Sequence, residues 1–514
     1  MRKLCLLSLL LWVSATVKSQ IPSNVVAPED AAFNGVYASR SVPKVSGKLL
    51  NLQAGEAKNL LITYSIVTPF AQMWNKKTTT AQPDGSFALE LDYALPYQQI
   101  WFGVGDYFYA GLCANSDLYV ELDMQKIKPV KDGVSFNGDG VRYLGTDGPL
   151  NVYLNNYILF KRPEQLDLSG KINMLMVSRA APDSLVPLYK GLYDSLGSIQ
   201  AQYIAANPSP YSWMLENERM SEFYGQICTR YWGKAMNDVL WQKIKQHKSF
   251  FVSNSGTTFY SYLATYVENM PGEKGAKASI DRTVQRLDSL FPPAKADYLK
   301  LRLNTSTDVG EQKAAWEKIA GSMKTAWCMS VEKKEWASTS AKLAEINQTL
   351  ARSSGGTALP SFGKPMIETT FGASLYKAES IKALDFVQKL KQSFPGKAIV
   401  IDRWATWCAP CLGEMPHSKE LQETSKDLPV VFVYLCTTSN SSESKWKSKV
   451  VELKQPGVHF LIDETLDAEL SSYFSFNGYP GYALIDKAGQ YKPGAIQWMS
   501  QIQDKDALAA LIEK

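Results

Sequence analysis

A motif of two cysteines three residues apart, Trp-Cys-Ala-Pro-Cys at residues 407–411, most constrains how this chain can fold. It follows shortly after the apolar, strand-like run at residues 398–402. If the first cysteine ends the loop after a strand and the second lies one helical turn later, their side chains are close enough to form a disulfide. The motif therefore predicts a strand, a short loop and a helix, with a redox-active dithiol where the helix begins.

The first thiol is the better nucleophile in this arrangement. At the start of a helix, Cys408 meets unpaired backbone N–H groups and the positive end of the helix dipole. A thiol with a pKa of about 8.5 is only about 3% thiolate at neutral pH, whereas a pKa near 7 gives about half. That shift is worth roughly 2 kcal/mol in favour of the anion. We therefore assign Cys408 as the attacking nucleophile and Cys411 as the buried resolving thiol.

A zinc site is the rival interpretation of two cysteines at this spacing. Zinc needs four ligands, normally from a second Cys or His pair at matching spacing, and the sequence has no such pair. His417 and His459 could serve as ligands only if the fold happened to bring them to the cysteines. Pro410 between the cysteines suits a helix start better than a zinc knuckle. The redox interpretation is favoured, and no metal is expected.

Residues 401–416, Ile-Asp-Arg-Trp-Ala-Thr-Trp-Cys-Ala-Pro-Cys-Leu-Gly-Glu-Met-Pro, resemble a known family. They are similar to the TlpA/ResA-type thiol-disulfide oxidoreductases, whose signature is W-x-x-W-C-x-P-C-x-x-E-x-P. The resemblance covers only the C-terminal part of the chain and implies an α/β thioredoxin fold there. It also implies a periplasmic or extracytoplasmic enzyme, usually a reductant of protein disulfides, that receives electrons from a membrane-bound thiol reductase.

Two carboxylates near the dithiol take roles from this resemblance. Asp402 falls where such proteins keep a buried acid beneath the active site, which would relay protons to Cys411. Burial would raise its pKa and make it a suitable base for a thiol. Glu414, one turn beyond Cys411, falls at the position of the family's active-site glutamate and would tune both thiols. The alternative for each is an ordinary solvated carboxylate.

The dipeptide Tyr479-Pro480 lies before a second strand-like run, where the family has a cis-proline loop. A cis bond before proline costs only about 0.5–1 kcal/mol, so a fold can enforce it. Beside Cys408, the backbone of Tyr479 would pair with a substrate strand. We expect Tyr479 and Pro480, with Trp407 and Pro410 of the motif, to form the substrate-binding surface. An ordinary trans turn proline is the alternative.

Arg403 departs from the family, where an apolar residue is usual beside the buried acid. A charged side chain is rarely fully buried without a partner. Arg403 could face another domain, pair with Asp402 or another neighbour, or extend to the surface. Pairing with Asp402 would lower that acid's pKa and weaken the proton-relay argument.

The N-terminus has the features of a secretion signal. Arg2 and Lys3 precede an apolar run at residues 4–13, and small residues precede a cleavage site before Gln20. The run is shorter than the roughly 20 residues of a membrane span. A cleaved signal peptide at residues 1–19 and a periplasmic location are expected, with an uncleaved tether as the alternative. The net charge of +5 gives no indication of nucleic-acid binding.

The 514 residues provide for several domains. Period-two alternation, as at residues 87–93 and 118–124, predicts a mostly antiparallel β-sandwich or barrel-like module over 30–145. This module weakly resembles the β domain found ahead of TlpA-like domains in many Gram-negative proteins. Helical periodicity follows over 150–352, where the apolar stripes are more readily explained as core than as a cofactor site. The predicted domain organisation ends with a linker at 353–359 and the thioredoxin-like domain at 360–514.

Cysteines outside the motif are sparse for a secreted chain. Cys113 and Cys436 lie in strand-like runs and are expected to be buried. Cys228 and Cys328 lie in the helical region, where a bridge between them is the alternative to two isolated buried thiols.

Two functions of different classes fit these features. The first is a periplasmic thiol-disulfide oxidoreductase without a cofactor, acting on disulfide-containing client proteins through a mixed disulfide. Reduction is the preferred direction, with oxidase or isomerase activity as the alternative. The second is a secreted scaffold in which the β and helical regions hold a partner and the dithiol is ancillary.

Overall fold

The computed structural model describes residues 25–53, 55–58, 60–68, 76–128, 138–250, 254–271, 279–353, 356 and 358–513. The predicted signal peptide lies outside these residues, as do positions 354, 355 and 357 of the predicted linker. Contacts divide the chain into two compact units, Met1–Asn304 with Lys318–Glu332, and Thr305–Glu317 with Lys333–Lys514. Within the described ranges, none of the helices combines the length and apolar character that a membrane span requires. The predicted domain boundaries stay predictions.

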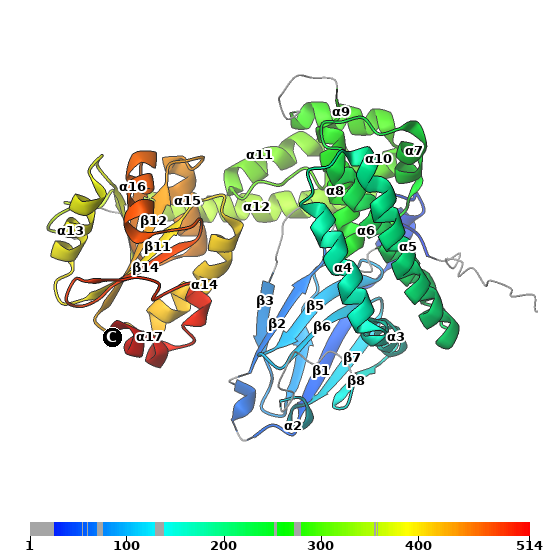
Figure 1. Cartoon of the computed structure of the whole chain (residues 1–514), viewed down its shortest axis with the longest axis horizontal. Coiled ribbons are helices and arrows are strands. Elements are labelled where there is room, and N and C mark those ends of the chain that lie inside the picture. The colour runs from blue at the N-terminus through cyan, green and yellow to red at the C-terminus, as the bar shows by residue number, and fades with distance from the viewer. Residues whose placement is uncertain are drawn as a thin grey trace, which may run out of the picture. The chain divides into compact units, whose positions relative to one another are not determined.

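The first unit contains two four-stranded sheets, which Figure 1 shows in blue and cyan. Their orders are β4-β1-β7-β8 and β3-β2-β5-β6. The strands are β1 (Lys44–Leu50), β2 (Leu61–Ile66), β3 (Lys76–Thr80), β4 (Ser86–Leu89), β5 (Gln98–Val104), β6 (Phe108–Ala114), β7 (Asp117–Asp123) and β8 (Val141–Leu144). Short helices α1 (Phe33–Ser39), η1 (Glu56–Lys58) and α2 (Met124–Ile127) accompany them.

One apolar core lies between these sheets, as expected of a sandwich. The alternation of apolar and polar residues along the strands explains this core, because Leu118, Val120 and Leu122 of β7 all point into it. Two details differ from the prediction. Strand β4 ends at Leu89, so the alternation over residues 90–93 continues in a loop, and β1 pairs with β7 in the parallel direction.

In the described part of the first unit, a series of helices follows the two sheets. They are α3 (Gly148–Leu159), α4 (Arg162–Met176), α5 (Pro182–Ala206), α6 (Ser212–Arg230), α7 (Asp238–Gln246), α8 (Asn254–Glu268), α9 (Ile280–Leu290) and α10 (Pro293–Lys300). Two further helices, α11 (Val309–Ala320) and α12 (Ala326–Arg352), each contribute residues to both units. The predicted fold class is confirmed: strand-rich sheets, then a helical region, then an α/β domain.

The apolar stripes predicted over 150–352 include one in α6, and its residues Phe223 and Ile227 are buried in the core. Cys113 of β6 is buried in a cluster with α3 and α6 rather than between the two sheets. Cys228 and Cys328 are buried free thiols, so the alternative of a bridge between them is wrong. Cys436 is likewise buried and free.

The second unit is built on a seven-stranded mixed sheet with the order β15-β14-β11-β12-β13-β10-β9. The strands are β9 (Ile367–Glu368), β10 (Ala373–Lys377), β11 (Ala398–Trp404), β12 (Val430–Thr437), β13 (Gly457–Ile462), β14 (Gly481–Ile485) and β15 (Tyr491–Lys492). Strands β10, β13, β12 and β11 run parallel to one another, whereas β14, β15 and β9 are antiparallel to their neighbours. The central strand β11 is buried along its whole length, as its run of apolar residues predicts.

Helices cover both faces of this sheet, as Figure 1 shows around β11 and β12. On one face, α14 (Ala409–Thr424), α15 (Glu443–Leu453) and α17 (Lys505–Glu513) pack on a core that includes Val400 and Trp404 of β11. On the other, α13 (Ala383–Ser393) and α16 (Glu464–Phe474) pack on Ile399 and Ile401. Alternation along β11 therefore directs Asp402 to the α14 face and Arg403 to the α16 face.

Two segments upstream of the predicted linker also belong to this unit. They are Thr305–Glu317 and the part of α12 that begins at Lys333. Val309, Ile346 and Val451 form a small buried cluster, which joins α11 and α12 to α15. The second unit therefore includes residues well before position 360.

Candidate redox site

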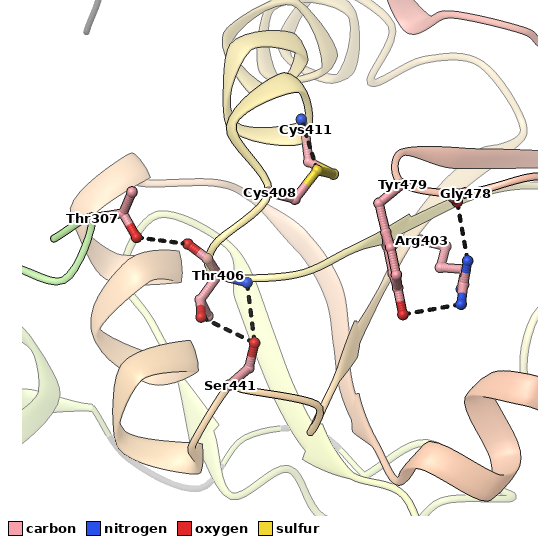
Figure 2. Close-up of a disulfide and its surroundings, with 8 residues drawn as sticks. All are labelled: Thr307, Arg403, Thr406, Cys408, Cys411, Ser441, Gly478 and Tyr479. Atoms are coloured by element: carbon pink, nitrogen blue, oxygen red, sulfur yellow. Dashed lines mark hydrogen bonds between the residues drawn. A yellow bond between two sulfur atoms is a disulfide. The ribbon is translucent and has the colours of Figure 1, made fainter. Parts of the chain in front are cut away.

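The two motif cysteines lie at the start of α14, immediately after the loop that follows β11. Cys408 is the residue that caps the helix, and Pro410 occupies its first turn, where a missing N–H costs nothing. Cys408 and Cys411 are joined in a disulfide with a Cα–Cα distance of 5.3 Å (Figure 2). Among the described residues, no group of three or more His, Cys, Asp or Glu side chains is placed to hold a metal ion.

The helix start provides hydrogen-bond donors to the first sulfur. The backbone N–H of Cys411 points at the Cys408 Sγ, with 3.2 Å between N and S. The N–H of Leu412 donates to the Cys408 carbonyl at 3.1 Å and begins the regular helical pattern. The side chain of Cys408 is only 3% exposed, and that of Cys411 1%. In the reduced protein, this N–H group and the helix dipole would stabilise a thiolate on Cys408.

Asp402 lies on the face of β11 that packs under α14. It is 2% exposed, and neither carboxylate oxygen has a hydrogen-bond partner among the residues that the structure describes. Burial, followed by the nearby charge of Glu414, raises the pKa of Asp402 to about 8. Asp402 is therefore mostly protonated at neutral pH and is not a solvated carboxylate.

Glu414 is half-buried in α14, and a backbone hydrogen bond holds its carboxylate. Its Oε2 accepts a hydrogen bond from the backbone N–H of Ser500 at 2.8 Å, in the short helix η2 (Met499–Gln501). This contact ties the second turn of α14 to the C-terminal part of the domain. The charge of Glu414 acts on the dithiol region through Asp402, whose pKa it helps to raise.

Arg403 is buried and paired with Asp467 of α16, not with Asp402. Its Nε donates to Asp467 Oδ1 at 2.7 Å and its Nη2 to Oδ2 at 2.9 Å, a two-bond fork geometry. The alternation of β11 explains this choice, because Arg403 and Asp402 point to opposite faces of the sheet. The proton-relay argument for Asp402 is therefore not weakened by Arg403.

The same guanidinium holds the loop that carries the cis-proline. Arg403 Nη1 donates to the Gly478 carbonyl at 3.0 Å, and Nη2 donates to the Tyr479 hydroxyl at 2.9 Å (Figure 2). The Tyr479 hydroxyl in turn donates to Asp467 Oδ2 at 2.6 Å. The guanidinium carbon lies 3.9 Å from the centre of the Tyr479 ring, a cation–π contact. The Tyr479-Pro480 bond is cis, as predicted.

Trp407 and Tyr479 form an aromatic rim beside the disulfide. Their ring centres are 5.4 Å apart in an edge-to-face arrangement. Trp407 is 45% exposed, and its Nε1 donates to the Ser439 carbonyl at 2.7 Å, which fixes the indole. Pro410 is exposed and Pro480 half-buried. The structure thus brings together the residues predicted to meet the substrate, although their binding role stays a prediction.

Three residues that shape the site were not found from the sequence. Asp467 is the partner of Arg403, and the only sequence signal for it was that a buried arginine requires an acid. Ser441 Oγ lies 3.2 Å from the Thr406 backbone nitrogen and 3.0 Å from Thr406 Oγ1, which fixes the loop before the motif. Thr307 donates to the Thr406 carbonyl at 3.1 Å from outside the predicted domain.

The C-terminal part of the chain is similar to known proteins. Residues 372–508 match the family described as Redoxin. Thioredoxin-like protein YneN of Bacillus subtilis (strain 168) is 29% identical over 112 residues, which are 21% of this chain and 62% of that protein. Thiol-disulfide oxidoreductase ResA of Bacillus thuringiensis subsp. konkukian (strain 97-27) is 30% identical over 123 residues, 24% of this chain and 66% of that protein.

Among solved structures, a putative thiol-disulfide oxidoreductase from Bacteroides vulgatus, determined in solution, is 30% identical, with a TM-score of 0.20. The match covers 23% of this chain and 74% of that one. This chain spans slightly less than two thirds of the length of the curated relatives named above. The dithiol at a helix start, the cis-proline loop and the family match agree: residues 372–508 are a redoxin domain with the thioredoxin fold, similar in sequence to thiol-disulfide oxidoreductases.

Proposed function

We propose that this chain is a periplasmic thiol-disulfide oxidoreductase that reduces disulfides in client proteins. The observation that carries the proposal is the position of Cys408, which caps α14 with a backbone N–H directed at its sulfur and Cys411 within bonding distance. The redoxin match and the names of the relatives support the same reaction class.

The reaction proceeds in two exchanges. In the reduced protein, the Cys408 thiolate attacks one sulfur of the client disulfide, forms a mixed disulfide and releases the other client sulfur as a thiolate, which takes up a proton from solvent. The Cys411 thiol then loses its proton and attacks the Cys408 sulfur. The second client sulfur leaves and is protonated, and the Cys408–Cys411 disulfide forms. Two electrons pass from the dithiol to the client.

The ionised form of Asp402, about a tenth of the population at pH 7 given its pKa of about 8, is the base we assign to the second exchange. Cys411 is 1% exposed, so its proton needs an acceptor inside the domain. The pKa of Asp402, raised by burial to about 8, lies close to that of an ordinary thiol, which allows proton transfer in either direction. An ordinary solvated aspartate, with a pKa of about 3.9, would be a much weaker base.

The oxidised protein must be reduced again before another cycle. We assign this step to a membrane-bound thiol reductase, which would donate two electrons by the reverse exchange at Cys408. The predicted signal peptide at residues 1–19 supports the periplasmic location, where an oxidising environment makes an external electron source necessary.

The experiment is reduction of insulin disulfides by the full chain with dithiothreitol as electron donor. We expect activity in the wild type and in Cys113→Ala, which removes a buried free thiol of the first unit, and none in Cys408→Ser. Prereduced Cys411→Ala, freed of dithiothreitol before insulin is added, should carry out the first exchange and accumulate the mixed disulfide with insulin. Activity that persisted in Cys408→Ser, or was absent from the wild type, would instead favour a scaffold with an ancillary dithiol.

Direction is tested by equilibrating the dithiol with glutathione. A reduction potential below about −200 mV supports a reductase, whereas one near about −120 mV would indicate an oxidase.

A further inference from the structure

The segment from Thr305 to Glu311 lies against the loop that carries the dithiol, although it precedes the redoxin match by more than sixty residues. Thr307 Oγ1 donates to the carbonyl of Thr406, two residues before Cys408, at 3.1 Å. Figure 2 shows Thr307 and Thr406 on one side of the dithiol loop and Tyr479 on the other. The active site therefore has a wall that the family match does not contain.

Contacts with α15 hold this segment in place. Lys445 pairs with Glu311 at 2.6 Å, and Lys449 donates to the Thr307 carbonyl. Ser306 Oγ donates to the same Glu311 carboxylate at 2.7 Å. Val309 also holds the segment in place, because its side chain is buried in the small cluster that joins α11, α12 and α15. The wall is thus preformed.

A cavity of about 290 Å³ lies between this segment and Trp407. Its lining mixes hydroxyl groups, carboxylates, an amide and ammonium groups, and includes Thr305, Asp308, Asn440 and Lys445. Asp308 and Glu311 balance Lys445 and Lys449, so the lining favours neither sign of charge. The charged groups already pair within the chain, as Lys445 does with Glu311. A neutral side chain that both donates and accepts hydrogen bonds suits this lining, because it can bond to hydroxyl and amide groups such as those of Thr305 and Asn440, which an apolar side chain cannot do.

The cavity lies next to the residue that precedes the reactive cysteine. Trp407 lines it and precedes Cys408, and consecutive Cα atoms lie about 3.8 Å apart. Cys408 itself is 3% exposed, so a client must approach it over exposed neighbours such as Trp407. In an extended client, residues follow one another at about 3.3 Å. Once the mixed disulfide has formed, a residue next to the client cysteine would therefore lie about one residue spacing from it, as Trp407, which lines the cavity, does from Cys408.

We propose that this cavity is a recognition subsite for the client polypeptide, which takes a hydroxyl or amide side chain next to the client cysteine. The proposal rests on the proposed function and specifies its substrate: extended segments in which Ser, Thr, Asn or Gln flanks the disulfide. Selectivity arises at the Thr305–Glu311 wall, opposite the cis-proline loop.

The test uses the prereduced full chain in single-turnover reactions, followed by tryptophan fluorescence. The probes are symmetric disulfides of two short peptides, with Asn-Cys-Asn or Leu-Cys-Leu at the centre, and hydroxyethyl disulfide, which has no flanking residues. Thr305→Trp fills the cavity from an exposed position, and Thr305→Ser is the matched control.

We expect the wild type and Thr305→Ser to react about tenfold faster with the Asn peptide than with the Leu peptide. Thr305→Trp should lose this preference while reacting with hydroxyethyl disulfide at the wild-type rate. An unchanged preference in Thr305→Trp, an equal loss on all three probes, or no preference in a wild type that reduces hydroxyethyl disulfide overturns the subsite alone. A wild type that reduces none of the probes overturns the proposed function as well.

Discussion

Replacing Asp402 with Asn should stabilise the second unit, and the gain should grow with pH. Asp402 has a folded-state pKa of about 8, raised first by burial and then by Glu414. In the unfolded chain its pKa is close to 3.9, so between these values the folded state binds one proton more than the unfolded state. Folding stability therefore falls by about 1.4 kcal/mol per pH unit across this window and levels off above pH 8.

The magnitude follows from the width of that window. The ionisable carboxyl of Asp402 lowers the free energy of unfolding by about 1.5 kcal/mol at pH 5 and by about 4 kcal/mol at pH 7. Asn has the shape of the protonated acid and does not titrate. The free energy of unfolding of Asp402→Asn should thus exceed that of the wild type by about 2.5 kcal/mol more at pH 7 than at pH 5.

Native-state hydrogen exchange of the oxidised full chain measures this difference where it arises. Peptides that cover β11 are followed by mass spectrometry in wild type and variant at the same pH, so the intrinsic exchange rates cancel. The ratio of wild-type to variant exchange rates should rise up to about 100-fold between pH 5 and pH 7. Asp427→Asn removes an exposed acid paired with Lys505 and is the control. A ratio for Asp402→Asn that did not change with pH would refute the assigned pKa.

The remaining predictions concern the Arg403–Asp467 pair, the Tyr479 hydroxyl and the buried cluster that joins α12 to α15. Arg403→Leu should lower the free energy of unfolding by about 3–5 kcal/mol, measured by thermal unfolding, because it leaves the Asp467 charge buried and unpaired. The double variant Arg403→Leu/Asp467→Leu should recover much of that loss. Equal stability of the single and the double variant would contradict this reasoning. Tyr479→Phe removes the hydroxyl that is hydrogen-bonded to both Arg403 and Asp467. This variant should reduce insulin more slowly than the wild type and hydroxyethyl disulfide at the same rate. Ile346→Ala should destabilise the second unit by about 2–5 kcal/mol, measured by exchange in α15, and no effect there would show that α12 does not support it.

Local signals in the sequence predicted much of the redox domain. The Cys408–Cys411 spacing, the apolar run of β11 and the residues around Pro480 each depend on a few neighbouring positions, and the structure has the disulfide, the buried strand and the cis bond at these places. Asp402 is buried for the same reason, since it continues an apolar strand. Short-range patterns were sufficient because each of these features is formed within one or two elements.

Long-range contacts were beyond these patterns. Arg403 and Asp467 are 64 residues apart, and Thr307 and Thr406 are 99 apart, so no local period connects them. The parallel pairing of β1 with β7 likewise depends on where two distant strands meet. For Arg403 the sequence posed the problem of a charge in an apolar strand, but only the fold identified the partner.

The neighbouring positions of Asp402 and Arg403 on the central strand have a consequence for how this domain can evolve. Gain or loss of one residue before them in β11 would rotate the guanidinium to the face beneath the dithiol and the neutral acid to the face of α16. Asp467 would lose its counter-ion, and the buried acid would leave the face of the sheet on which α14 and the dithiol lie, in the same event. Lineages that carry this pair should therefore tolerate insertions in surrounding loops while keeping the length of this strand constant.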